Sequence, residues 1–212
     1  LTVEERFIRV GRTARFHQLG DPLTAPRLWV VVHGYGQLAR YFLNAFAPVA
    51  GADAVVAPEG LSRFYLDDAH QRVGAAWMTR EDREHEIDDH VRYLDALIEL
   101  LQPTAGRRPL HVLGYSQGVA TVARWLARGR ARPVQAVLWG GSLPPELQHE
   151  DLATAFHGCS VDLVHGEQDA LVPRAQWEQN AERLVLAGIA VERHLFPGGH
   201  ALDPVVLRRC FG

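Results

Sequence analysis

One serine in the chain lies between two glycines, in the pentapeptide Gly114-Tyr115-Ser116-Gln117-Gly118. A short apolar run precedes this pentapeptide and an apolar repeat typical of a buried helix follows it, so we expect the serine between a strand and a helix. The glycines carry no Cβ atoms, which lets a strand and a helix cross closely there. The serine hydroxyl then projects from a strained turn, and the pattern predicts nucleophilic catalysis through an acyl-serine.

A serine hydroxyl is a weak nucleophile, so it needs a histidine base that a carboxylate orients. His200 follows a glycine pair just after the last predicted strand, and Asp169 lies in the loop after an earlier strand. The chain order Ser116, Asp169, His200 is one that this type of turn allows. Asp203 is the competing carboxylate, but an acid near the beginning of a final helix is explained by the helix dipole. We therefore predict Ser116, Asp169 and His200 as the catalytic residues.

Acyl transfer also needs donors for the negatively charged oxygen of the intermediate. The backbone N–H of Gln117, at the beginning of the helix, is one candidate. A second glycine-containing loop, residues 33–36, follows a buried strand, and there we predict the N–H of Tyr35. His33 is expected to fix this loop through a hydrogen bond and to take no part in the chemistry.

Aromatic and aliphatic side chains in the loops that follow predicted strands are candidates for the wall of an acyl pocket. They are Phe64, Tyr65, Trp77, Leu143 and Leu171. For the three aromatic residues, covering the core is an equally weighted alternative. Once the strands and helices are assigned, no insertion is left that could fold as a separate lid, so we expect an open site.

The framework that must position these residues alternates between strands and helices. Mostly apolar runs predict buried parallel strands at 28–32, 54–57, 110–113, 134–139 and 161–166, and the alternation with helices is completed by a predicted strand at 191–196. Helical periodicity predicts helices at 41–49, 83–101, 119–126 and 174–186. An edge hairpin is expected from 4–10 and 13–19, a polar loop at 58–71 and a helix-ending segment at 103–109. We predict one α/β domain over residues 1–212, with a mostly parallel sheet of about eight strands and helices on both faces.

Composition excludes several other mechanisms and partners. The 212 residues carry a net charge of −3, and all 22 basic residues are arginine. Without lysine, Schiff-base chemistry and a phosphate-binding lysine are excluded, and nothing indicates nucleic-acid binding. Cys159 and Cys210 are far apart and have no metal-ligand spacing, so we expect reduced, structural thiols. The acidic stretch at 80–86 is explained by a helix beginning. We therefore expect no metal and no organic cofactor.

No apolar run is long enough to span a bilayer. We expect a cytoplasmic protein, although removal of a leader is left open because the numbering begins at Leu1. A homodimer is left open as well.

The chain resembles the α/β-hydrolase superfamily and, within it, the small carboxylesterase and lysophospholipase family that also contains acyl-protein thioesterases. The matching segments are 33–36, 114–118, 141–144, 165–169 with 172–173, and 199–200. Members usually carry an aspartate after the first glycine loop and a glycine pair that closes the serine turn, whereas this chain has Gln37 and Val119. These departures concern the acyl preference and leave the three catalytic residues in place.

The resemblance implies a hydrolase that cleaves short-to-medium acyl carboxylic esters through an acyl-serine. The same serine chemistry would also serve an acyl-protein or acyl-CoA thioesterase, an amidase or a lysophospholipase, and the sequence does not separate them. A receptor that kept the pocket and lost turnover is the alternative from a different class.

Overall fold

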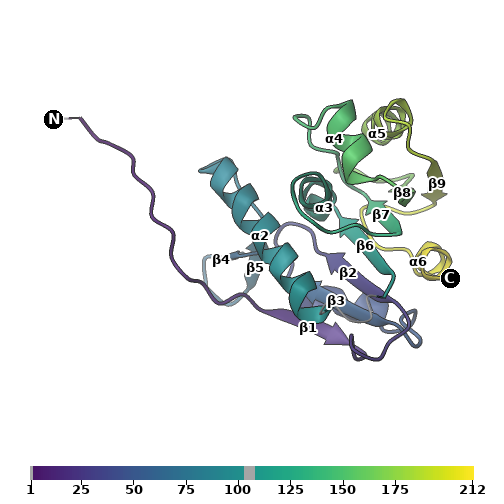
Figure 1. Cartoon of the computed structure of the whole chain (residues 1–212), viewed down its shortest axis with the longest axis horizontal. Coiled ribbons are helices and arrows are strands. Elements are labelled where there is room, and N and C mark those ends of the chain that lie inside the picture. Colours follow the sequence, from purple (N-terminus) through teal and green to yellow (C-terminus); the bar gives the residue numbers. More distant parts are fainter. Residues whose placement is uncertain (1, 103–107) are drawn as a thin grey trace.

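The centre of the molecule is a seven-stranded, mostly parallel sheet (Figure 1). The computed structural model describes residues 2–102 and 108–212. The strands of the central sheet are β1 (Phe16–Leu19), β2 (Leu28–Val32), β3 (Ala54–Pro58), β6 (Leu110–Tyr115), β7 (Gln135–Trp139), β8 (Ser160–Gly166) and β9 (Val191–Phe196). Their order across the sheet is β1-β3-β2-β6-β7-β8-β9. Only the edge strand β1 pairs antiparallel, with β3.

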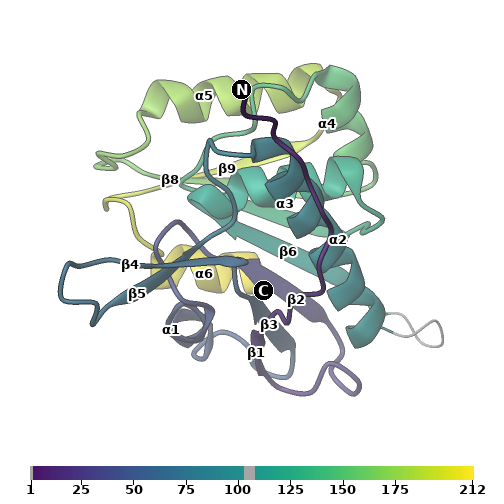
Figure 2. The same cartoon turned by 90° about the vertical axis from the view of Figure 1, so that its left-hand side faces the viewer.

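Helices cover both faces of the sheet, as the sequence predicts (Figure 2). They are α1 (Ala39–Leu43), the 3₁₀ helix η1 (Asn44–Phe46), α2 (Arg83–Leu101), α3 (Gln117–Arg128), α4 (His149–Ala155), α5 (Arg174–Leu186) and α6 (Pro204–Phe211). Helices α2 to α5 pack on one face, and α1 and α6 pack on the other. Within the described residues, no helix is both long and apolar enough to cross a membrane. The predicted α/β architecture is confirmed, with seven strands in the central sheet.

Most predicted elements lie where the sequence places them. Strands β2 and β3 are buried at every position, which explains their unbroken apolar runs. Helix α2 and helix α5 have the predicted bounds, 83–101 and 174–186. The predicted helix at 41–49 is instead the shorter pair α1 and η1, and α4 was not predicted. Of the helix-ending segment at 103–109, residues 103–107 lie outside the described residues.

The predicted polar loop at 58–71 is wrong in part, because it contains a strand. Strand β4 (Ser62–Tyr65) pairs antiparallel with β5 (Val73–Ala76) in a separate two-stranded hairpin. Gly36 N–H donates to the Ala75 carbonyl at 2.9 Å, which fastens this hairpin to the loop after β2. Gly74 allows the close approach, because a Cβ there would lie 2.5 Å from the Gly36 carbonyl oxygen.

The buried carboxylate of Glu59 holds the beginning of the hairpin to the edge of the sheet. Its Oε1 accepts hydrogen bonds from Arg15 and Arg63, both at 2.7 Å. Burial alone would raise the pKa of Glu59, but the two guanidinium groups outweigh it and hold the pKa below its usual value. The pairing leaves no uncompensated charge at this buried position.

The predicted edge hairpin from 4–10 and 13–19 is wrong. Only Phe16–Leu19 forms a strand, and it gains its partner from β3. The preceding residues have no helix or strand, and Val3, Ile8 and Val10 are largely exposed. An isolated two-stranded ribbon needs a face to pack against, and alternation alone does not supply one.

The crossing of β2 and α3 predicts a steric requirement for Gly118. A Cβ there would lie 2.2 Å from the Val32 carbonyl oxygen and 3.0 Å from that of His33, and neither backbone group can swing away. Alanine favours a helix over glycine by about 1 kcal/mol, but overpacking costs about 1–3 kcal/mol. Gly118→Ala should therefore lower the free energy of unfolding in urea titrations by up to about 2 kcal/mol. Gly11→Ala is the control, since no atom lies within 4 Å of its added Cβ; equal stability of the two variants would contradict the steric argument.

Candidate functional site

The backbone of Ser116 is held in a strained turn between β6 and α3. Its φ is 55° and its ψ is −118°, a conformation that non-glycine residues rarely adopt. A Cβ at Gly114 would lie 2.5 Å from the Gly118 carbonyl oxygen, so the turn depends on glycine at both flanks. Strand β6 lies near the middle of the sheet, between β2 and β7. The arrangement presents the serine at the carboxyl end of the sheet, ahead of the first turn of α3.

The loop after β2 lies directly beside Ser116. A Cβ at Gly34 would be 3.0 Å from the Cβ of Ser116. Within the loop, Gly34 N–H donates to Gln37 Oε1 at 2.8 Å, and Gln37 N–H donates to the Gly34 carbonyl. Gly36 N–H is used by the hairpin. Among the described residues, no acceptor is found for the N–H of Tyr35 or for that of Gln117. These two free donors are the ones that the sequence predicts for an oxyanion.

His200 and Asp169 form the hydrogen bond expected between a base and its orienting acid. His200 Nδ1 lies 2.7 Å from Asp169 Oδ2, and the Asp169 side chain is 1 % exposed. Asp169 Oδ1 accepts from the backbone N–H groups of Leu171 and Val172 at 2.8 and 3.0 Å. Burial alone would raise the pKa of Asp169, but these donors outweigh it and the pKa lies below its usual value. The carboxylate is therefore charged at neutral pH and favours a proton on His200 Nδ1.

Two glycines bring the serine and the histidine pair to one place. A Cβ at Gly140 would lie 3.5 Å from both Asp169 Oδ2 and His200 Nδ1. A Cβ at the neighbouring Gly141 would lie 2.3 Å from the Ser116 carbonyl oxygen. The three predicted catalytic residues thus surround the short segment that follows β7.

Tyr115 and Trp139 fasten both sides of this site, and sequence reasoning missed them. Tyr115 donates its hydroxyl to the His200 carbonyl at 2.8 Å, and its ring lies 5.2 Å from the His200 ring. Trp139 accepts from Ser116 N–H at 2.9 Å and donates its indole N–H to the Ala201 carbonyl at 3.0 Å. The position of Tyr115 inside the pentapeptide was the available signal. Trp139 directly precedes the glycine pair, but its type alone indicated only a core residue.

The side chain of Gln117 has a structural role that the sequence did not indicate. Its Oε1 accepts from Trp77 N–H at 3.1 Å, and its Nε2 donates to the Met78 carbonyl at 2.9 Å. The amide clamps the end of the hairpin against the first turn of α3. The backbone N–H of Gln117 is left available.

His33 fixes its loop as predicted. Its Nε2 accepts from Gly60 N–H at 3.0 Å, so Nδ1 carries the proton and donates to the Gly34 carbonyl at 2.7 Å. Burial lowers the pKa of His33 and outweighs the carbonyl of Gly34 and the charge of Glu59. His33 therefore stays neutral and holds the loop after β2 to the loop after β3.

The structure separates the predicted pocket residues into two groups. Phe64 is half-buried and its ring lies 5.0 Å from that of Tyr35, which itself is largely exposed, while Leu171 is exposed beside Asp169. Tyr65 is on the opposite face of β4 and packs on His70. Trp77 and Leu143 are 2 % exposed and belong to the core. For Trp77 this agrees with the alternative of covering the core, whereas for Leu143 the sequence indicated only the pocket.

In the part of the chain that is described, both thiols are buried and two carboxylates of the acidic stretch have protein partners. Cys159 and Cys210 are free and buried. In the acidic stretch, Glu86 binds Ser62 Oγ and Thr79 N–H, and Glu84 pairs with Arg128. Protein partners thus account for these two carboxylates.

The geometry and the fold define a class of protein. A partly buried serine on a strained turn, a histidine held by a buried carboxylate and free backbone donors at one sheet edge are characteristic of α/β-hydrolases. A sequence model described as phospholipase/carboxylesterase matches residues 24–210, so the chain belongs to the phospholipase/carboxylesterase family. A search of curated proteins finds no match to the sequence.

Solved structures of similar fold include several hydrolases. Esterase PE8 is 21 % identical, with a TM-score of 0.71 over 94 % of this chain and 97 % of that one. A carboxylesterase of Bacillus cereus is 17 % identical, with a TM-score of 0.68 over 93 % and 92 %. Acyl-protein thioesterase 2 of Zea mays is 17 % identical, with a TM-score of 0.68 over 94 % and 100 %. The α/β-hydrolase fold that the sequence predicts is confirmed.

The buried His90 behind Trp77 predicts a loss of stability in acid. Neither of its ring nitrogens makes a hydrogen bond of normal geometry with the described residues, although the backbone carbonyls of Trp77 and Glu86 lie nearby. Burial first, and Arg124 second, lower its pKa from 6.5 to about 4, against the favourable carbonyls of Trp77 and Glu86. As pH falls below 6.5, the unfolded chain takes up this proton before the folded one, so stability should fall until about pH 4. The loss is on the order of 3 kcal/mol.

Urea titrations across this pH range measure the effect. His90→Leu should reduce the slope of unfolding free energy against pH by up to about 1.4 kcal/mol per pH unit. The residual slope comes from His33, His111 and His165, whose pKa values burial also lowers. Toward pH 4 the lowered pKa values of Glu59, Glu146 and Asp169 add to it. An unchanged slope in His90→Leu would show that His90 is protonated in the folded chain.

Proposed function

We propose that this protein is a serine hydrolase that cleaves short-to-medium acyl carboxylic esters through an acyl-serine intermediate. The observation that carries the proposal is the strained Ser116 turn placed against the same glycine pair as the His200–Asp169 hydrogen bond. Membership in the phospholipase/carboxylesterase family supports hydrolysis of this type.

In the acylation half, Ser116 Oγ attacks the ester carbonyl carbon and His200 Nε2 takes the hydroxyl proton. Asp169 stabilises the resulting imidazolium and keeps the proton on Nδ1. The carbonyl oxygen becomes an oxyanion, which accepts hydrogen bonds from the free N–H groups of Tyr35 and Gln117. When the C–O bond breaks, the leaving alcohol takes the proton from His200 Nε2.

In the deacylation half, water replaces the alcohol. His200 Nε2 accepts a proton from the water as its oxygen attacks the acyl carbon, and the same two N–H groups stabilise the second oxyanion. Collapse of this intermediate releases the carboxylic acid and returns the proton to Ser116 Oγ. This chain's own residues move every proton, and the steps as written use no cofactor.

The walls around the site favour uncharged acyl groups of limited length. Tyr35 with Phe64 packed on it, and Leu171 next to Asp169, offer apolar surface around the site and are at least partly exposed. The side chains of Trp77 and Leu143 pack in the core and therefore cannot extend the pocket wall. A short apolar wall leaves the far end of a long chain in water, so the benefit of chain length should end early.

A thioesterase acting on acyl-protein or acyl-CoA, a lysophospholipase and an amidase would use the same residues. Fold similarity to the Zea mays acyl-protein thioesterase does not by itself favour one of them. Ester hydrolysis needs no residue beyond these, because His200 supplies the proton with which the alcohol leaves. A receptor without turnover remains the alternative outside the enzymes, and a turnover assay separates it.

The first test is a panel of p-nitrophenyl esters from acetate to decanoate. We expect kcat/KM to rise by up to about fourfold per added methylene, equivalent to about 0.8 kcal/mol, and then to level off. No jump in rate should occur where the substrate forms micelles. Ser116→Ala should lower kcat by about 10⁶-fold and abolish labelling by a fluorophosphonate.

Three results would overturn parts of this proposal. Labelling of a different serine would remove Ser116 as the nucleophile. A wild-type chain that labels nowhere and turns over no ester would favour the receptor. Activity restricted to micellar or long-chain lipid would show that the hairpin of β4 and β5 opens as a lid over a longer pocket.

The second test concerns the acid. Asp169→Asn should lower kcat on the order of 10⁴-fold, because an amide favours the wrong imidazole tautomer. Asp203 instead caps α6, where its Oδ1 accepts from Val205 and Val206 N–H at 2.9 Å each. Asn is also a good helix cap, so Asp203→Asn should leave kcat and stability nearly unchanged and serves as the matched control. A larger loss of kcat in Asp203→Asn than in Asp169→Asn would reverse the assignment.

A further inference from the structure

A second cluster of side chains that can bind a metal lies on β8, β9 and α6. Asp162 comes from β8, His194 from β9 and Cys210 from α6, and each offers one ligand atom. The three ligand atoms lie within 4.8 Å of one another, and among the described residues this is the only group of its kind. Asp162 and Cys210 are buried, and the His194 side chain is 11 % exposed.

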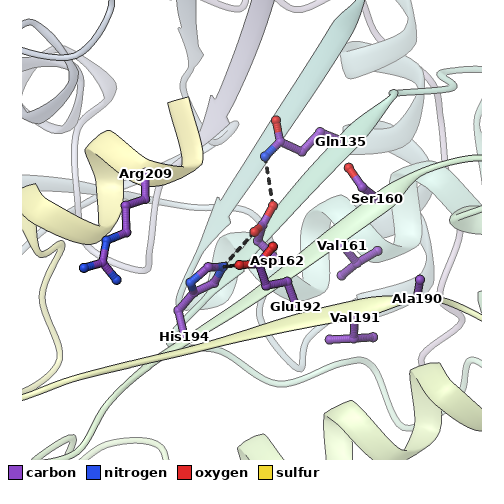
Figure 3. A pocket seen from close by; sticks show the side chains of 9 residues that line it. All are labelled: Gln135, Ser160, Val161, Asp162, Ala190, Val191, Glu192, His194 and Arg209. Carbon is purple, nitrogen blue, oxygen red and sulfur yellow. Dashed lines mark hydrogen bonds and ion pairs between the residues drawn. The ribbon is translucent and has the colours of Figure 1, made fainter. Parts of the chain in front are cut away.

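Neighbouring residues already orient the carboxylate of this cluster (Figure 3). Gln135 donates from Nε2 to Asp162 Oδ2 at 2.8 Å and also to the Cys210 carbonyl at 3.1 Å. His111 Nδ1 lies 2.9 Å from Gln135 Oε1 and fixes the amide in turn. The second oxygen, Asp162 Oδ1, lies 2.7 Å from His194 Nε2. A ligand carboxylate held by an outer shell of this kind is typical of metal sites.

The cluster also has a route to solvent. An open groove of about 680 Å³ adjoins it, lined in part by Asp162, Glu192, His194 and Arg209. Figure 3 shows the carboxylates of Asp162 and Glu192 next to each other, both facing the same nitrogen of the His194 ring. Glu192 Oε1 is 3.8 Å from His194 Nε2, and its side chain is 76 % exposed, so it can reach an ion from the solvent side.

We propose that Asp162, His194 and Cys210 form a transition-metal site, with Glu192 or water as the fourth ligand. The donors are one thiolate sulfur, one imidazole nitrogen and one or two carboxylate oxygens, a set that Zn²⁺ accepts in tetrahedral geometry and that Mg²⁺ and Ca²⁺ do not favour. On binding, Cys210 releases its thiol proton to solvent. His194 moves its remaining proton to Nδ1, and the ion replaces the hydrogen bond between His194 Nε2 and Asp162 Oδ1.

The sequence predicts no metal, and the spacing explains why. The three ligands lie on separate elements, and His194 and Cys210 are the closest pair along the chain, on β9 and α6. No short motif records such a set, and only the parallel pairing of β8 with β9 brings it together. The ion would join these two strands to the last helix, so its role is structural and independent of the proposed hydrolase activity.

Cobalt is the probe that tests this site, because Co²⁺ occupies Zn²⁺ sites and a thiolate ligand gives it a charge-transfer absorption band. Chelator-treated full-length protein should bind one Co²⁺ per chain, show the thiolate band, and lose it when Zn²⁺ is added. Cys210→Ser should abolish the band. Cys159→Ser is the matched control, since Cys159 is equally buried but belongs to the core on the other face of the sheet.

Affinity measurements on two further variants extend the test. His194→Gln should weaken Zn²⁺ binding at least tenfold, and Gln135→Leu should weaken it by about 10- to 100-fold through the outer shell. Zn²⁺ should raise the melting temperature of the wild-type chain and not that of His194→Gln. Circular dichroism of the chelated variants checks that each is folded.

Three outcomes would overturn the site. The first is the absence of saturable Co²⁺ binding by the wild-type chain. The second is a thiolate band that survives in Cys210→Ser, and the third is a band lost in Cys159→Ser. In any of these cases the cluster is a buried hydrogen-bonded pair of His194 with Asp162, and Cys210 is a packing residue.

Discussion

The close approach between the first turn of α3 and the end of β2 is the contact on which the site depends. With glycine at 118, the helix lies against the Val32 carbonyl, where a Cβ would be only 2.2 Å away. This contact fixes the depth at which α3 begins and therefore the height of Ser116 above the sheet. It also explains the unfavourable φ of 55° at Ser116. Because α3 begins so close to β2, the backbone between β6 and α3 must turn sharply, and one residue adopts a strained conformation. The strain is stored in one residue and is offset by the packing of the whole of α3.

A second consequence is that the predicted nucleophile and base share their supports. Tyr115 precedes Ser116 and holds the His200 carbonyl, while Trp139 holds Ser116 N–H on one side and the Ala201 carbonyl on the other. The relative position of Ser116 and His200 therefore does not depend on contacts between long loops. Two buried aromatic residues at the ends of adjacent strands set the distance, and the parallel pairing of Tyr115 with Trp139 sets the register between them. Arrangements built on strands in this way are more rigid than loop-based ones.

The sequence predicts the buried half of this molecule well and its edges poorly, for physical reasons. Strands β2 and β3 are covered on both faces, so every position is apolar and the pattern has one interpretation. Residues 4–10 alternate as a strand would, but alternation does not say which surface covers the apolar side. Only Phe7 gains partial cover, from the ring of His85, while Ile8 and Val10 stay exposed. The strand β4 was hidden because its polar and aromatic residues are only partly buried. Trp77 and Leu143 were predicted at the pocket from their loop positions, yet large apolar side chains near a sheet edge are drawn into any available core.

The site residues divide in the same way. Ser116, Asp169 and His200 carry motifs because their chemistry restricts residue type, order and flanking glycines. The residues that hold them act through amide and hydroxyl groups that many side chains could supply. Gln37 illustrates this, since it stands where the related family usually has aspartate and still accepts the Gly34 N–H at 2.8 Å. The loop needs only one acceptor oxygen for the Gly34 N–H. The neutral amide of Gln37 supplies it without placing a negative charge beside a developing oxyanion. Gln37 therefore keeps the loop geometry and makes the surroundings of the Tyr35 N–H less negative than an aspartate would.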